Sequence, residues 1–521
     1  MTVTVSWINT VIIYSKQMNL HYPLYKMLLV AGLLLLGNFV RAQFTIQPSS
    51  YITIKEGSTL RIGSDLNINS NVTASGYLVD QTNDGDVTIT GNISVKRYMS
   101  ADYWHNASSP VSSSNSSVYT GTELVFYYDE TLIINDWMFG WVMYSGALSV
   151  MRGYDVYIDA TPVTVNYTAT GAQTINTGTY SSGVAITSFP NGETDPHRGW
   201  NLLGNPYPSP VNWQASGWDK SDINDAKYIW DGPNDNYTIW LGGGAPIGIN
   251  GGTQYIPSNQ GFWVQASQNG SVQISNSTRI GTTPATPDFY KSETQDYPIL
   301  DLLARANGYT DECMIRFLPK TTAAFDLNFD ATKLFSQGNE VPQICTQSTN
   351  VKLAINTLPA LEDELMVSLS FRCKKSGFYS IEINDVTNLD AFTKVYLKDV
   401  LEQKVIDLTN ELKYSFHHDP MNGANRFKIY FNPSADVINN MTPVDYFSVY
   451  AMQGGITILK NTNKLITGEI WIYNTMGQPV YNTALNNDKK CALNLNVASG
   501  YYYVSIITQQ QVSNFKVFIN N

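Results

Sequence analysis

Charged residues are scarce in this sequence. Only 14% of its 521 residues are Asp, Glu, Lys or Arg, whereas an average soluble domain has about 25%. The formal net charge is −11, and no block rich in Lys and Arg occurs. Nucleic acids and anionic membrane surfaces are bound chiefly through basic patches, so we expect neither as a partner.

Residues that build reactive centres are also few. The chain has 5 His and 4 Cys, and it contains no C-x-x-C pair, H-E-x-x-H helix, G-x-S-x-G turn or phosphate-binding loop. Such motifs mark zinc, redox, hydrolase and nucleotide sites. We therefore expect no catalytic residues and no enzyme. Free thiols are expected at Cys313, Cys345, Cys373 and Cys491, although an exported protein could oxidise one pair of them.

Long apolar runs are missing except near the N-terminus. The run from Met27 to Gly37 follows Lys26 and precedes Val40-Arg41-Ala42. It is too short for a membrane helix of about 20 residues and suits the core of a signal peptide. We predict that Met18 is the true start, that residues 1–42 comprise an over-extended start plus a signal peptide, and that cleavage follows Ala42. No transmembrane helix is expected after the signal.

What the sequence has in abundance is aromatic and turn-forming residues. It contains 33 Tyr, 11 Trp and 37 Gly, and its apolar residues alternate with polar ones in short runs broken by Gly, Asn, Asp or Ser. A period of two with frequent turns is typical of strands. Since no long amphipathic helix is apparent, the predicted fold class is all-β.

Four regions follow from this pattern. Closely spaced doublets such as Ile52/Ile54 and Leu66/Ile68 predict a strand-rich region over residues 43–98, built either as solenoid-like rungs or as a small sheet. Residues 99–285 predict an aromatic-rich β-sandwich and residues 286–435 a second sandwich, each jelly-roll or Ig-like. Residues 436–521 predict a linker followed by a small Ig-like sandwich.

The last region carries a distinctive motif. It runs through Ile470-Trp471-Ile472-Tyr473-Asn474-Thr475-Met476-Gly477-Gln478-Pro479-Val480-Tyr481, then Ser499-Gly500-Tyr501-Tyr502-Tyr503-Val504, and ends with Phe515-Lys516-Val517-Phe518-Ile519. Asn474 to Gly477 predicts a turn whose Gly adopts positive φ, and Gly500 predicts a tight entry into the Tyr-rich strand.

This region resembles the type A C-terminal sorting domain of the type IX secretion system, found in certain Gram-negative bacteria. The motif residues are Asn474, Gly477, Gln478, Gly500, Tyr501 and Lys516. The family usually has a residue other than proline at the position of Pro479, so Pro479 is expected to weaken an edge pairing.

The resemblance implies a route out of the cell. The translocon recognises such a domain after export through the periplasm, a sorting peptidase removes it near the preceding linker, and the body is often attached covalently to surface lipopolysaccharide. Upstream segments, among them Gly199 to Pro210, resemble the bodies of other surface proteins that use this route. We therefore expect an extracellular or cell-surface, non-catalytic protein with a structural or adhesive role. The alternative is a carbohydrate- or calcium-dependent binding module that supports a partner enzyme.

Four tryptophans between residues 200 and 263 are candidate glycan-facing aromatics. Exposed indole rings stack on the apolar faces of sugars, but sandwich cores also bury aromatic side chains routinely. The candidates are Trp213, Trp218, Trp230 and Trp240.

Calcium is the single candidate cofactor. Asp231 and Asp235 lie in a turn rich in oxygen donors, and the loop Asn83-Asp84-Gly85-Asp86 is a weaker candidate. Neither has the twelve-residue EF-hand spacing, and tight turns require the same residue types for backbone reasons.

Overall fold

A computed structural model describes most of the chain after residue 42. The described ranges are 43–82, 86–112, 114–119, 124–132, 140–169, 175–186, 198–281, 297–348, 351–362, 364–389, 393–435, 437–438, 446–461, 465–508 and 512–520. The predicted signal peptide, and Asn83, Asp84 and Gly85 of the weaker calcium loop, lie outside them.

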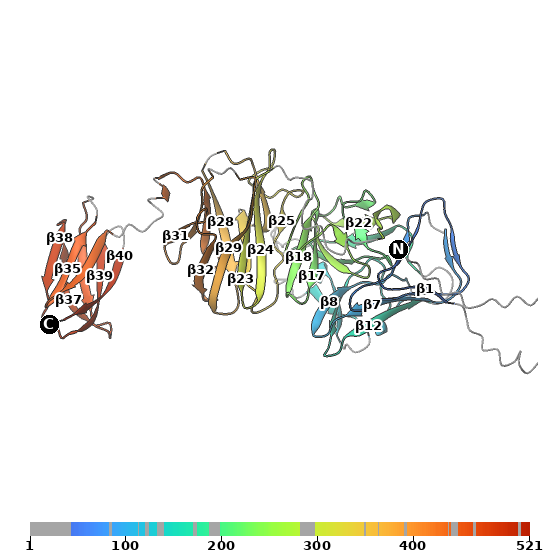
Figure 1. Ribbon diagram of the computed structural model, residues 1–521, viewed down its shortest axis with the longest axis horizontal. Helices are drawn as coiled ribbons and strands as arrows, with labels where there is room; N and C mark the ends of the chain where they lie inside the picture. Colours follow the sequence, from blue (N-terminus) through green and yellow to red (C-terminus); the bar gives the residue numbers. More distant parts are fainter. Residues whose placement is uncertain are drawn as a thin grey trace, which may run out of the picture. The chain divides into compact units, whose positions relative to one another are not determined.

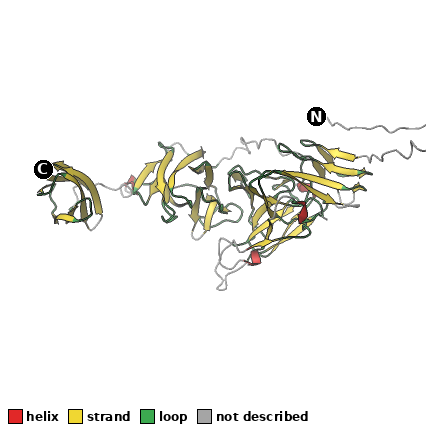
Figure 2. Ribbon diagram, turned by 90° about the horizontal axis from the view of Figure 1, so that it is seen from below, coloured by secondary structure: helices red, strands yellow, loops and turns green. Residues whose placement is uncertain are grey.

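The described residues confirm the all-β fold class. The named helical elements are three short 3₁₀ turns, η1 (Ser116–Val118), η2 (Glu130–Leu132) and η4 (Asn276–Thr278), among 40 strands. Figure 2 shows the preponderance of strands. In the described part of the chain, no helix has the length and apolar character needed to cross a membrane.

The chain divides into two compact units. The first comprises residues 1–397 with 406–432, and the second comprises residues 433–521 with the short segment 398–405. The three upstream regions predicted from the sequence therefore lie together in the first unit, apart from residues 398–405 and 433–435.

The first region of this unit is a short parallel solenoid. β1 pairs in parallel with β4 and β4 with β7, while β2 pairs with β5 and β3 with β6. Each turn of the chain thus stacks on the one before, as the solenoid-like alternative requires. The strands are β1 (Gln43–Ile46), β2 (Tyr51–Ile54), β3 (Leu60–Ile62), β4 (Asp65–Ile68), β5 (Tyr77–Asp80), β6 (Val87–Ile89) and β7 (Ile93–Met99).

The second region contains several smaller antiparallel sheets. Two of them matter here: a four-stranded sheet in the order β10-β9-β11-β8 and a five-stranded sheet in the order β14-β21-β17-β18-β19. The strands are β8 (Tyr103–Ala107), β9 (Val125–Tyr128), β10 (Trp141–Met143), β11 (Tyr154–Ile158), β12 (Val163–Ala169), β13 (Tyr180–Val184), β14 (Trp200–Gly204), β15 (Val211–Asn212), β16 (Trp218–Asp219), β17 (Ala226–Asp231), β18 (Asn236–Leu241), β19 (Ile247–Ile249), β20 (Tyr255–Ile256), β21 (Gly261–Gln265) and β22 (Gly270–Ile274).

The third region forms one continuous 11-stranded sheet around a single core. Figure 1 shows β24, β23 and β29 lying side by side in it. The path runs β31-β30-β33-β28-β26-β27-β24-β23-β29-β32, and β25 pairs with β27. The strands are β23 (Ile299–Ala306), β24 (Tyr309–Phe317), β25 (Ala331–Thr332), β26 (Gln343–Ser348), β27 (Val351–Leu358), β28 (Leu365–Arg372), β29 (Gly377–Thr387), β30 (Val395–Asp399), β31 (Lys404–Asp407), β32 (Lys413–His418) and β33 (Phe427–Phe431).

Buried polar contacts join the second and third regions. The Lys333 Nζ lies 2.6 Å from both carboxylate oxygens of Asp311, and neither side chain is exposed. Asp311 also accepts hydrogen bonds from the side chains of Asn236 and Asn250, which belong to the five-stranded sheet and the loop after it. Because these buried groups are mutually satisfied, the two regions form one packed structure.

The second unit is a seven-stranded sandwich with its own core. One sheet has the order β34-β35-β38 and the other β37-β36-β39-β40, which agrees with the predicted small Ig-like fold. The strands are β34 (Phe447–Met452), β35 (Gly455–Lys460), β36 (Gly468–Tyr473), β37 (Pro479–Leu485), β38 (Lys490–Asn494), β39 (Gly500–Thr508) and β40 (Val512–Ile519).

The predicted motif turn has the expected geometry. Gly477 has φ +79°, and the Asn474 carboxamide oxygen accepts hydrogen bonds from the backbone N–H groups of Met476 and Gln478, both at 3.0 Å. Pro479 opens the edge strand β37, where the pairing with β36 shifts register. An edge position and a strand start are the places where a sheet tolerates proline.

The expectation for Gly500 is wrong. Its φ is not positive, and a Cβ added there would come no closer than 3.9 Å to another heavy atom, a ring carbon of Tyr502. The entry into β39 therefore does not require glycine. The neighbouring motif residues Tyr501 and Lys516 do meet, since the Lys516 Nζ lies 4.4 Å from the centre of the Tyr501 ring.

Candidate functional site: an aromatic cavity

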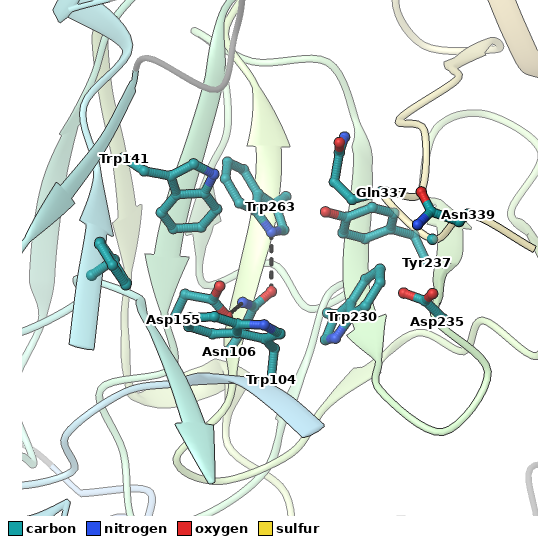
Figure 3. Close-up of a pocket in the computed structure, with 12 residues that line it drawn as sticks. Trp104, Asn106, Trp141, Asp155, Trp230, Asp235, Tyr237, Trp263, Gln337 and Asn339 are labelled. Atoms are coloured by element: carbon teal, nitrogen blue, oxygen red, sulfur yellow. Dashed lines mark hydrogen bonds between the residues drawn. The ribbon is translucent and has the colours of Figure 1, made fainter. Parts of the chain in front are cut away.

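A cavity of about 580 Å³ lies between the four-stranded and five-stranded sheets of the second region. This volume falls in the range of about 300–1,000 Å³ that is usual for small-molecule sites. Its walls are mainly aromatic, with a few polar groups, as Figure 3 shows. The lining residues are Trp104, Asn106, Phe126, Trp141, Asp155, Trp230, Asp235, Tyr237, Trp263, Gln337, Gly338 and Asn339.

Strand alternation places one wall. Along β11, Tyr154, Val156 and Ile158 enter the core beneath the sheet, so Asp155 faces the other way. The pairing sets Asp155 opposite Asn106 of β8 and Phe126 of β9. These three side chains therefore form a row across one face of the sheet.

The opposite wall comes from the five-stranded sheet. Trp230 and Tyr237 are cross-strand partners on β17 and β18, with ring centres 5.0 Å apart. In β21, Phe262 and Val264 enter one core, while Trp263 faces the cavity side. The core contacts of Phe262 and Val264 hold β21 in place, so Trp263 has a fixed position in the cavity wall.

A hydrogen-bonded chain crosses between the two sheets. The Trp263 Nε1 donates to the Asn106 carboxamide oxygen at 3.0 Å, and the Asn106 Nδ2 donates to a carboxylate oxygen of Asp155 at 2.8 Å. Figure 3 draws both bonds. The two bonds fix the orientation of the Asn106 amide and hold one oxygen of Asp155. Within the described ranges, no protein group donates to its second oxygen.

The environment perturbs the ionisation of Asp155. Burial raises the pKa of this carboxyl to about 8, and the hydrogen bond from Asn106 opposes the rise. Burial also raises the pKa of Asp235. A strongly perturbed acid in an aromatic cavity is a feature of functional sites, although structural networks can produce it too.

One donor in the wall lacks a partner. The Nε1 atom of Trp230 is buried and makes no hydrogen bond in the described structure. An unsatisfied buried donor costs about 1–3 kcal/mol, so a ligand oxygen accepting from Trp230 would be favoured.

The rim of the cavity is supplied by the third region. A Cβ on Gly338 would lie 2.0 Å from a carboxylate oxygen of Asp235 and 2.7 Å from the Cγ2 atom of Val341, so a larger residue there would force these side chains to move. The Lys374 Nζ donates to the Gln337 carbonyl oxygen at 2.9 Å and holds the loop. The rim position thus depends on the packing between the two regions.

The structure separates the four candidate tryptophans. Trp230 lines the cavity, whereas Trp213 is fully buried in a different core and cannot stack on a ligand. Trp218 and Trp240 are half-buried and pack against that same core. The four tryptophans therefore do not form one glycan-facing platform. Trp213 is part of a sandwich core, and of the four only Trp230 lines the cavity.

The residues that the sequence reasoning missed are Trp104, Trp141 and Trp263. They come from β8, β10 and β21, far apart in the sequence. An alternating aromatic pattern was visible at each, but nothing in the sequence indicated which sheet faces meet.

The candidate calcium ligands are not brought together. Asp235 lines the aromatic cavity, while Asp231 lines a smaller polar cavity with Glu312 and accepts a hydrogen bond from Asn234 at 2.7 Å. In the described part of the chain, no group of three or more His, Cys, Asp or Glu side chains is placed to hold a metal ion. The turn geometry, with φ +48° at Asp235, accounts for these residue types.

The four cysteines and the neighbouring residues His417 and His418 lie in and around the sheet of the third region and in the second unit. All four cysteines are free thiols, and Cys313, Cys345 and Cys373 are buried. His418 is buried and contacts the Cys373 carbonyl oxygen at 3.1 Å, whereas His417 is exposed on the opposite face of β32.

Comparison with known proteins gives a family but no activity. One solved structure to which the chain is similar is titled "Biofilm associated protein - BSP domain"; the match has 10% identity and a TM-score of 0.13, and covers 82% of this chain and 92% of that chain. A TM-score this low supports no argument about function. No curated protein matches the sequence. A family model described as "Domain of unknown function (DUF8693)" matches residues 36–431, which is more than half of the 521 residues, so the chain belongs to this family.

Proposed function

We propose that this chain is a non-catalytic, carbohydrate-binding surface protein with an adhesive role, and that the aromatic cavity is its binding site. The observation that carries the proposal is the cavity itself. Its indole rings surround a polar floor formed by Asn106 and Asp155.

The lining chemistry suits a sugar. A pyranose ring has apolar C–H faces, which pack on the electron-rich faces of aromatic rings, and hydroxyl groups around its edge. Here the second oxygen of Asp155 accepts hydrogen bonds, and the free Nε1 of Trp230 donates one. Trp104, Trp141 and Trp230 are each half-buried and keep part of their surface available for stacking.

The test is a glycan array followed by calorimetry on the full chain. Trp230→Ala removes one wall and is expected to weaken sugar binding at least tenfold. Trp240→Phe is the matched control, because Trp240 lies on the same hairpin and does not line the cavity. Absence of binding to any glycan would refute the proposal, and cleavage of a bound glycan would refute its non-catalytic part.

We further propose that the second unit delivers the body to the cell surface as a type IX secretion sorting domain, behind an N-terminal signal peptide. Two observations favour this. The unit has its own core, and the family match ends at Phe431, next to the boundary between the units. In this proposal the translocon and its sorting peptidase are the partners, and surface lipopolysaccharide is the attachment point.

Export can be tested with a fusion. A fusion of residues 433–521 to a reporter with a signal peptide should be found outside a cell that expresses the type IX translocon. Retention of the reporter in the periplasm of that cell, with the fused domain folded, would refute the sorting role.

A further inference from the structure

The described lining of the cavity contains acidic side chains but no basic ones. Asp155 and Asp235 are acidic, and none of the lining residues among the described ranges is Lys, Arg or His. An anionic sugar such as a uronate would meet two carboxyl groups and no cation of the described lining, since Lys374 acts on Asp235 at the rim without lining the cavity. A neutral or cationic ligand is therefore favoured by charge.

The two acids are not equivalent. Asp235 lies at the rim, where the positive charge of Lys374 lowers its pKa against the effect of burial. Among the described residues, the neutral donor Asn106 is the hydrogen-bond partner of Asp155, and no cation contributes to its ionisation. Of the two lining carboxyl groups, Asp155 is therefore the one without a positive partner in the described part of the chain.

The aromatic walls favour a cation at the same place. Trp141 and Trp263 meet at 86° with ring centres 5.4 Å apart, and Trp230 and Tyr237 meet at 64°. Within each pair the rings touch edge to face, so the lining rings stand at different inclinations and do not form one flat platform. A cation beside the face of an indole ring is attracted by the negative charge of the ring face, most strongly when water is excluded.

We infer that the ligand is a saccharide that carries a free primary amine, with its ammonium group paired to Asp155 and its ring against the indole walls. This inference rests on the proposed carbohydrate-binding function and specifies the sugar class for the same cavity.

Binding of an ammonium group should change the number of protons that the protein binds, and this change can be measured. The titratable groups lining the cavity are Asp155, Asp235 and Tyr237. With a pKa of about 8, Asp155 is mostly protonated in the ligand-free protein at pH 7. A paired ammonium favours the carboxylate and lowers this pKa, so a sugar whose amine is already protonated in solution should release a proton from Asp155 when it binds at pH 7.

The experiment compares three oligosaccharides of equal length on the full chain: glucosamine, N-acetylglucosamine and glucose oligomers. Calorimetry at pH 7 in two buffers of different ionisation enthalpy measures affinity and proton release together. The glucosamine oligomer is expected to bind at least tenfold more tightly than the other two and to release protons. Asp155→Asn should abolish this preference, so that the glucosamine oligomer binds no more tightly than the glucose oligomer, and Trp240→Phe should leave the preference unchanged.

The outcomes separate the two proposals. Equal affinities for all three sugars, or tighter binding of the acetylated one, would overturn the amine inference and leave carbohydrate binding intact. An undiminished amine preference in Asp155→Asn, with a thermal unfolding midpoint like that of the parent, would also overturn it. Failure of all three sugars and of the glycan array would instead refute the proposed function.

Discussion

The buried ion pair between Lys333 and Asp311 should be among the most sensitive points of the first unit. Both side chains are 0% exposed, and the Lys333 Nζ is 2.6 Å from both carboxylate oxygens. Lys333→Met leaves the Asp311 carboxylate with three neutral donors: the Asn236 and Asn250 side chains and the Ile344 backbone N–H. Removing one partner of a buried pair costs about 3–5 kcal/mol, because the remaining charge stays buried without compensation.

An exposed pair of similar length provides the control. Lys375 Nζ lies 2.7 Å from a carboxylate oxygen of Glu340, and the two side chains are 47% and 49% exposed. Since exposed pairs contribute about 0–1 kcal/mol, Lys375→Met should change stability little. The double variant Asp311→Asn with Lys333→Met removes both buried charges and should be more stable than Lys333→Met alone.

The assay is urea denaturation of the full chain followed by tryptophan fluorescence. If Lys333→Met lowers the free energy of unfolding by no more than Lys375→Met does, the conclusion that the buried pair Lys333–Asp311 stabilises the packing of the second and third regions is refuted. The double variant gives a second check, because a charge-driven effect requires it to recover part of the loss.

Three further predictions concern single residues. Gly477→Val should destabilise the second unit and retain the protein in the periplasm, because φ +79° is costly for a β-branched residue. Gly500→Ala should be exported normally, because a Cβ fits at that position. Pulse-chase fractionation of the cells distinguishes the two outcomes. Lys227 is buried and its pKa is lowered to about 7, so between pH 7 and 10 the unfolded chain binds more protons and stability should rise with pH by up to about 1.4 kcal/mol per unit. Lys227→Met should flatten that rise in urea titrations, and an unchanged slope would contradict the assignment. Trp230→Ala should weaken sugar binding at least tenfold where Trp240→Phe does not, and equal losses in calorimetry would place the sugar elsewhere.

The sequence predicted the features that depend on local pattern. Doublets such as Leu66/Ile68 indicated strands, and because each short unit needs a neighbour to cover its apolar face, the stacking of β1, β4 and β7 was foreseeable. The positive φ of Gly477 was likewise predictable, since a tight turn between two alternating strands needs such a residue.

The sequence could not assign sheet faces. Trp213 and Trp230 occur in similar aromatic, turn-rich stretches, yet one is fully buried in a core and the other lines the cavity. The difference arises because the sheet containing Trp230 faces the sheet of β8 and β11, more than 70 residues upstream. Period-two patterning shows that a side chain lies on one face of a sheet, but the partner of that face is decided by long-range pairing.

Gly500 shows a second limit of sequence reasoning. It lies in a motif with Gly477 and is the same residue type, but its backbone is extended and the space around it is open. The backbone conformation therefore favours glycine at position 477 but not at position 500, and the sequence alone does not distinguish the two positions.

Delivery and binding should be separable by mutation. The described residues that line the cavity lie between Trp104 and Asn339, inside the first unit and inside the family match, whereas the proposed sorting motif lies in the second unit, beyond that match. The two units have separate cores, so a change that unfolds one need not unfold the other. We therefore expect Trp230→Ala to be exported like the parent chain, and Gly477→Val, purified as a full chain, to bind sugar with the parent affinity. Loss of sugar affinity in Gly477→Val would show that the cavity depends on the second unit and would refute this division of roles.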